Sequence, residues 1–110
     1  MLNPSPAALD PAPIFAALGD RTRLTLLGKL ADGQARSISA LSLDTDLTRQ
    51  AITKHLHVLQ DAGLVASLRV GRESRFAARR ETLDEARAYL DRVSAQWDNV
   101  LGRLKTFVEG

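Results

Sequence analysis

The C-terminal third of the chain carries an apolar pattern that only a helix satisfies over its full length. Apolar side chains recur there at alternating spacings of three and four residues, at Leu83, Ala86, Leu90, Val93, Trp97, Val100, Leu104 and Phe107. This heptad pattern predicts a single long helix with one continuous apolar stripe. The stretch Thr82-Leu83-Asp84-Glu85 matches a capping box, in which a hydroxyl and a carboxylate satisfy exposed amides, so we expect the helix to begin there.

Such a helix is too long for the domain that could surround it. About 27 helical residues at 1.5 Å each span about 40 Å, whereas 110 residues form one ordinary domain. The stripe could instead pack wholly against its own domain. Its length, and the large Trp97 in its middle, favour burial against a second copy of the chain. We therefore expect a homodimer.

The N-terminal segment divides into an arm and a first helix. Residues 1–9, with two prolines, show no periodicity and are expected to form a flexible arm, whereas residues 10–110 form a single domain. Asp10 followed by Pro11 predicts a helix start, because Asp caps free amides and proline has no amide to satisfy. Gly19 is expected to end this short helix in the left-handed conformation.

Two more short helices are expected before residue 48. The second helix is capped by Asp20, ends at Asp32-Gly33, and carries apolar residues at helical spacing, at Leu24, Leu27 and Leu30. Residues 37–47 contain the third helix, opened by Ser39 and buried through Leu41.

The middle of the chain predicts a helix-turn-helix followed by a wing. Thr48 is expected to cap a fourth helix over residues 49–62 that stops at Gly63. The connection around residues 45–47 is only a few residues long, which is the spacing of a helix-turn-helix. Residues 64–78 alternate around a Gly-Arg turn and predict a two-stranded hairpin. The predicted fold is therefore mainly α with a small β-hairpin: a winged helix-turn-helix with four helices, two strands and a long final helix for dimerisation.

The fourth helix has two faces of different chemistry. Ile52, Leu56 and Leu59 fall in one narrow arc of a helical wheel, which must face the core. The opposite side carries hydrogen-bonding residues that could reach base edges in a DNA major groove, and with the helix start these are Thr48, Arg49, Gln50, Thr53, Lys54 and His57. A solvated face is the alternative. The corner before the helix and the hairpin after it favour base reading.

The charges are unevenly distributed along the chain. The total is only +2, but residues 47–80 carry +5, against −1 for residues 1–46 and −2 for residues 81–110. Arg69, Arg72 and Arg75 surround the predicted hairpin tip, where they could hold phosphates or enter a minor groove. The alternative is an edge hairpin kept soluble by charge. The predicted partner is double-stranded DNA.

Three motifs in this order resemble the bacterial ArsR/SmtB family of transcriptional repressors. They are Leu18-Gly19-Asp20-Arg21-Thr22-Arg23-Leu24, the stretch from Thr48 to Leu59 (TRQAITKHLHVL), and Asp61-Ala62-Gly63-Leu64-Val65. The similarity covers about residues 12–108. Arg21 stands where the family often has proline, and Asp46 where its helix-turn-helix corner often has glycine. Asp tolerates the left-handed conformation, so the second change need not break the turn.

The resemblance implies a homodimeric repressor of an imperfect palindromic operator. In the family the first and last helices form the dimer interface. Carried onto this sequence, that interface comprises Ile14, Phe15 and Leu18 beside Leu90, Val93, Trp97, Val100 and Leu104.

Many members of the family sense metals, but this sequence lacks their ligands. The chain has no cysteine, and its last helix has no histidine. His55 and His57 point about 200° apart on one helix and cannot share an ion, and His55 is better explained as a half-buried packing residue. We therefore expect no metal site of the known kinds and no cofactor. An inducer is not identified, and a repressor with an oxygen-rich metal site between the last helices remains an alternative.

Other function classes find little support in the sequence. There is no nucleophile elbow, glycine-rich phosphate loop or HExxH motif, so we do not expect an enzyme. Without cysteine, signal-like N-terminus or membrane-length apolar run, the chain is expected to be cytoplasmic. A winged helix that binds an acidic protein instead of DNA is the second alternative.

Overall fold

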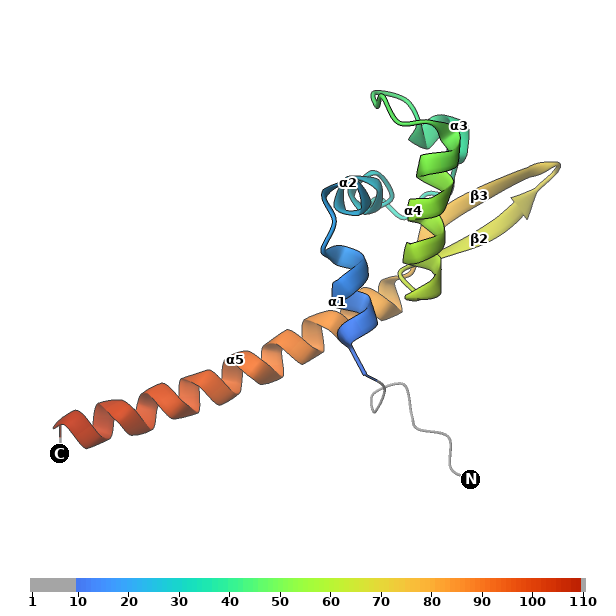
Figure 1. Cartoon of the computed structure of the whole chain (residues 1–110). Helices are drawn as coiled ribbons and strands as arrows, with labels where there is room; N and C mark the ends of the chain where they lie inside the picture. Colours follow the sequence, from blue (N-terminus) through green and yellow to red (C-terminus); the bar gives the residue numbers. More distant parts are fainter. Residues whose placement is uncertain (1–9, 110) are drawn as a thin grey trace.

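The computed structural model describes residues 10–109, so the predicted arm over residues 1–9 lies outside the described residues. Most of the described chain is helical, with a small antiparallel sheet and one long helix that projects from the rest (Figure 1). The elements in chain order are α1 (Ala12–Leu18), α2 (Arg21–Lys29), β1 (Arg36–Ser37), α3 (Ile38–Leu41), α4 (Arg49–Asp61), β2 (Val65–Val70), β3 (Glu73–Ala78) and α5 (Arg80–Glu109). The predicted winged helix-turn-helix order is confirmed.

The sheet has one strand more than the sequence predicts. β2 and β3 form the expected hairpin, closed by a turn at Gly71-Arg72 whose glycine has a φ of +64°. The two-residue strand β1 pairs with the other edge of β3, with Arg36 opposite Phe76, so the strand order is β1-β3-β2. The expected hairpin is therefore part of a three-stranded sheet, and β1 fixes the start of α3 to the middle of β3.

The core is built around α4. Its residues Ile52, Leu56 and Leu59 are fully buried, as the wheel predicts. They belong to one buried cluster with side chains from every other helix and from the sheet, namely Ile14, Ala17, Leu26, Leu30, Leu41, Leu64, Val65, Phe76 and Ala86. Packing on several sides fixes the orientation of α4.

The predicted apolar stripe of α2 is only partly correct. Leu30 is buried and Leu27 is partly buried, but Leu24 is exposed and Leu26 takes its place in the core. Leu26 belongs to the same buried cluster as Ile52, Leu56 and Leu59 of α4, and the three- and four-residue spacing within α2 alone does not show which of its leucines joins that cluster.

The predicted caps of α2 and α4 are confirmed. The hydroxyl of Thr48 accepts a hydrogen bond from the amide of Ala51 at 3.0 Å, and the carboxylate of Asp20 accepts one from the amide of Arg23 at 3.0 Å. The predicted start of α1 is shifted: the N-cap residue is Pro11 and the helix begins at Ala12, while Asp10 lies before the cap and accepts a hydrogen bond from the amide of Ala12 at 2.9 Å.

Three local predictions are wrong. The cap of α3 is Ser37 instead of Ser39, because the Ser37 hydroxyl accepts from the amide of Ala40 at 3.1 Å. Gly19 has φ −79° and is not left-handed. The left-handed residue before α4 is Asp44, at φ +66°, and not Asp46. Asp tolerates this conformation, so the turn forms without glycine.

The start of α5 differs from the predicted capping box. The helix begins at Arg80, which places Thr82 inside its first turn. The Thr82 hydroxyl donates a 2.6 Å hydrogen bond to the carbonyl of Gly63, and its side chain is 7% exposed. Gly63 itself needs its φ of +80° to turn the chain out of α4. This hydrogen bond therefore fastens the end of the predicted reading helix to the start of the long helix.

Candidate nucleic-acid interface

The polar face of α4 is accessible along its whole length. Arg49, Gln50, Lys54 and His57 are exposed, and Thr53 is partly buried. The buried leucines and isoleucine of the same helix hold these side chains outward. The predicted base-reading residues therefore lie on one surface, as the wheel requires.

Two of the predicted reading residues use their hydroxyls within the helix. Thr48 caps it, and the Thr53 hydroxyl donates to the carbonyl of Arg49 at 2.7 Å. Their methyl groups remain available for apolar contact, such as with a thymine methyl. The long polar side chains on this face are those of Arg49, Gln50 and Lys54.

The three wing arginines are not equivalent. The guanidinium of Arg75 lies 2.8 Å from the carboxylate of Glu73. Arg69 and Arg72 are exposed, and within residues 10–109 neither has a carboxylate within ion-pair distance. At the base of the wing, Arg79 lies 3.4 Å from Glu81. The net charge of +5 for residues 47–80 already counts Glu73, but Glu81 lies outside that segment, so its pairing with Arg79 lowers the uncompensated charge further. On the wing, the uncompensated charge is concentrated at Arg69 and Arg72.

A hollow joins the reading helix to the wing. It has a volume of about 390 Å³ and is lined by Arg49 and Arg72 together with Ser37, Ile38, Ser39, Glu73 and Ser74. The fold thus brings the first residue of α4 and the tip of the wing to one concave surface. Ser39 and Ser74 were not among the predicted contacts. Their only sequence signal is their closeness to predicted turns and caps.

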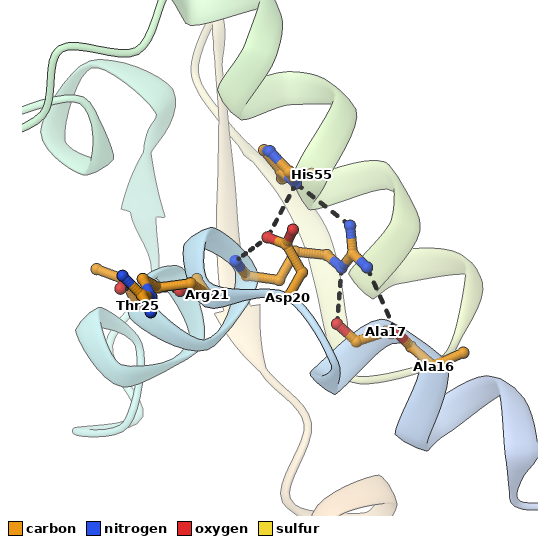
Figure 2. Close-up of polar contacts among 7 residues, drawn as sticks. Ala16, Ala17, Asp20, Arg21, Thr25 and His55 are labelled. Carbon is orange, nitrogen blue, oxygen red and sulfur yellow. Dashed lines mark hydrogen bonds and ion pairs between the residues drawn. The ribbon is translucent and has the colours of Figure 1, made fainter.

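His55 of α4 faces the corner between α1 and α2 (Figure 2), and the Arg23 side chain contacts both His55 and that corner. The guanidinium of Arg23 donates to the carbonyls of Ala17 at 2.6 Å and Ala16 at 3.3 Å, and lies 3.4 Å from Nδ1 of His55. That nitrogen is also 3.7 Å from the carboxylate of Asp20. His55 is partly buried, as predicted, and packs one helix on another.

The charge of Asp20 suits this position. The hydrogen bond from the Arg23 amide lowers the pKa of the Asp20 carboxyl, and the nearby Arg23 and His55 side chains act in the same direction against partial desolvation. Asp20 therefore stays ionised at neutral pH, where it both caps α2 and faces the histidine of α4.

The apolar stripe of α5 leaves its own domain after its first turns. Ala86 is buried, but Leu90, Trp97 and Leu104 are each more than half exposed, while Val93 and Val100 are partly buried. Leu101 and Val108 lie in the same arc and are also exposed, although they fall outside the alternating three- and four-residue spacing that predicts the stripe. The stripe is therefore broader than predicted and faces solvent in the single chain.

The predicted contribution of α1 to a dimer is uneven. Ile14 is 8% exposed and belongs to the core of its own chain. Phe15 packs against Tyr89 of α5 with ring centroids 5.7 Å apart, and Leu18 is partly buried. Phe15 and Leu18 retain surface that a partner could cover, whereas Ile14 positions the helix.

Neither a metal cluster nor a membrane span is found in the described part of the chain. Within residues 10–109, no three or more His, Asp or Glu side chains converge closely enough to hold an ion. No described helix is sufficiently long and apolar to span a bilayer.

The comparisons agree with this architecture. Residues 18–67 match the family model described as a helix-turn-helix domain. The ArsR-like transcriptional regulator from Rhodococcus sp. RHA1 is 42% identical and superposes with a TM-score of 0.78, over 88% of this chain and 91% of that one. This chain belongs to the ArsR family of transcriptional regulators.

Two further relatives extend the comparison. The uncharacterized HTH-type transcriptional regulator YuzN of Bacillus subtilis (strain 168) is 46% identical to this ArsR-family regulator over 65 residues, which is 54% of the regulator and 71% of YuzN. A homodimeric winged helix-turn-helix DNA-binding domain from Mycobacterium bovis, a possible ArsR-family transcriptional regulator, is 27% identical. It superposes with a TM-score of 0.63 over 87% of the regulator and 91% of its own chain.

Proposed function

We propose that this ArsR-family regulator is a homodimeric repressor that binds an imperfect palindromic DNA operator through α4 and the wing. The exposed polar face of α4 carries the proposal, because the core holds that face outward beside the wing arginines. The M. bovis relative is a homodimer. The exposed apolar stripe of α5 supports the same assembly here.

Two-fold symmetry defines the form of the proposed operator. Two reading helices related by a two-fold axis contact half-sites about one helical turn, or 34–36 Å, apart, so the operator is palindromic. Phosphate contacts supply most of the affinity, and base contacts from α4 supply specificity. Repression follows when the bound dimer occludes a promoter.

Selection of bound duplexes from a random pool tests the DNA-binding claim. The expected result is an enriched palindromic sequence. Titration of that sequence at increasing salt should give a log-log slope of roughly −5 to −9, as about 6 to 10 phosphate contacts per dimer predict. Equal affinity for every sequence would reject specific recognition. Little binding at physiological salt would favour a protein-binding winged helix.

A double variant tests the assignment of base reading to α4. Gln50→Ala with Thr53→Ala should reduce the preference for the selected operator over a scrambled duplex, by about 1–3 kcal/mol per lost base contact. Gln34→Ala with Thr25→Ala is a matched control, because the Thr25 hydroxyl makes the same kind of bond, to the carbonyl of Arg21 at 3.0 Å. An unchanged preference in the first variant would move base reading elsewhere.

Zinc titration tests the proposal that DNA binding needs no metal of the known kinds. Operator affinity should be unchanged between chelator-treated protein and protein with added zinc. A zinc-dependent change would instead support an oxygen-rich site formed between two chains.

A further inference from the structure

An apolar groove runs along α2 and the start of α5, away from the proposed DNA-binding face. Its volume is about 530 Å³, and its apolar lining comprises Leu24, Leu27, Leu30, Ala31, Ala78 and Leu83. Leu24 is 52% exposed there, although it lies on a short helix that otherwise packs into the core. Asp32 and Arg80 add polar groups to the lining. A large exposed leucine beside an apolar hollow is typical of a surface that is covered by a partner.

Small residues keep the groove open. A Cβ atom added at Gly28 would meet no atom within 4 Å, and Ala31 and Ala78 fill little space nearby. The groove is therefore a preformed depression in the single chain, suited to one or two large apolar side chains.

The α5 stripe has a symmetry that identifies the occupant. Ala86, Leu90, Val93, Trp97, Leu101, Leu104 and Val108 are spaced by 4, 3, 4, 4, 3 and 4 residues, so the spacing is the same read in either direction from Trp97. Two antiparallel copies of α5 related by a two-fold axis at Trp97 would therefore match these seven positions with one another, whereas Val100 and Phe107 would lie level with polar residues of the partner helix. Leu90 then lies level with the partner subunit's Leu104, and Ala86 with the partner subunit's Val108.

This pairing carries the end of one α5 to the groove of the other chain. The last turn of α5 holds the two most exposed large apolar residues of the described chain, Phe107 at 85% and Val108 at 80%. Opposite Ala86, that turn lies next to Leu83, which lines the groove. The partial negative charge at the C-terminal end of a helix also suits Arg80, which lines the groove as well.

We propose that the groove between α2 and α5 receives the last turn of the partner's α5, with Phe107 and Val108 as the inserted side chains. The inference rests on the proposed homodimer and goes beyond it by adding α2, through Leu24 and Leu27, to the interface. Each dimer then has two such contacts, one at each end of the antiparallel helix pair, and both lie away from the reading helices.

Cysteine pairs test the contact directly, because the natural chain contains no cysteine. Leu24→Cys and Phe107→Cys are prepared as separate variants, mixed to exchange subunits, and treated with an oxidant or a short bis-maleimide. The mixture should give a covalent dimer, and neither variant alone should. Leu24→Cys mixed with Asn99→Cys is the control, because Asn99 lies on the side of α5 opposite the stripe.

Filling the groove tests its contribution to assembly. Gly28→Met should raise the dimer dissociation constant about 10- to 100-fold, because the methionine would occupy the groove and leave a large apolar side chain of the partner's last turn exposed to solvent. Gly28→Ala, which leaves the groove open, is the matched control. Far-ultraviolet circular dichroism of both variants verifies that each chain still folds.

The outcomes separate this inference from the homodimer itself. If mixed Leu90→Cys and Leu104→Cys chains crosslink but the mixture of Leu24→Cys and Phe107→Cys does not, the groove contact is refuted and the antiparallel dimer stands. Crosslinking of Leu90→Cys with itself would indicate parallel helices and also refute the contact. A monomer in sedimentation at all concentrations would overturn the proposed homodimer, and this inference with it.

Discussion

The unequal wing arginines give the sharpest prediction for DNA binding. Arg69 and Arg72 are exposed without a carboxylate partner in the described chain, whereas Arg75 lies 2.8 Å from Glu73. Single replacements by alanine should therefore have different effects. Loss of Arg69 or Arg72 is expected to remove a proposed phosphate contact, whereas loss of Arg75 removes a charge that Glu73 already compensates.

The size of the effect follows from the number of wings. Each phosphate contact contributes about 0.9 to the salt slope, so Arg72→Ala in both wings of a dimer should reduce the slope by about 1.8. Between 50 and 200 mM salt the variant should then lose about tenfold less affinity than the natural protein does. Arg75→Ala should change the slope by much less. Glu73→Gln should steepen the slope, because it frees the Arg75 charge for a phosphate.

Fluorescence anisotropy with the selected operator at several salt concentrations measures these slopes. Each slope requires only titrations of one labelled duplex, and far-ultraviolet circular dichroism verifies the folding of each variant. Equal slope changes for Arg72→Ala and Arg75→Ala would refute the reasoning from the Glu73 pair. Slopes unchanged in all variants would remove the wing from the interface.

Three further predictions concern assembly and stability. Trp97→Ala should weaken the dimer by at least about 2 kcal/mol in sedimentation equilibrium, as loss of a central interface aromatic does; the same loss for Asn99→Ala, on the opposite face, would contradict a role specific to the stripe. Thr82→Val should cost about 1–3 kcal/mol in urea unfolding because it leaves the carbonyl of Gly63 unpaired, and a change below 0.5 kcal/mol would contradict it. Asp32→Asn should lower the melting temperature at neutral pH. The side-chain hydrogen bonds from Arg36 lower the pKa of Asp32 from 3.8 to about 2, so its contribution is complete above pH 3.8 and is lost as the pH falls through 2. A melting-temperature difference that persists below pH 2 would contradict this assignment.

The helices that carry the candidate site were predictable because their signals are local. Thr48 precedes an amphipathic stretch, so its hydroxyl caps α4 and Ile52, Leu56 and Leu59 face the core as expected. Periodicity also identifies the polar face of α4, since the residues on the side of the helix opposite the core must face solvent. The family motifs, which occur in the expected order, added the prediction that the polar face of α4 binds DNA.

Predictions failed where a distant group competes for a residue. The Thr82-to-Glu85 pattern is a capping box in isolation, but the carbonyl of Gly63 takes the Thr82 hydroxyl in the folded chain. β1 has only two residues and no periodicity, and it exists because Phe76 and Arg75 lie opposite. Ser37 caps α3 in place of Ser39, because β1 ends at Ser37 and α3 begins at the next residue.

The sequence by itself determined the order of the helices, the hairpin, the two faces of α4 and the family, because helix periodicity, caps and motifs are encoded in neighbouring residues. Only the tertiary structure decided which charges and apolar surfaces remain free. It pairs Arg75 with Glu73, leaves Arg69 and Arg72 exposed, and opens the groove beside Leu24. The groove depends on where side chains from α2, β3 and α5 meet, and no spacing along the chain specifies that meeting. Glu73 and Arg75 lie two positions apart on β3 and so share one face of it, but this pairing follows only once the strand itself is known.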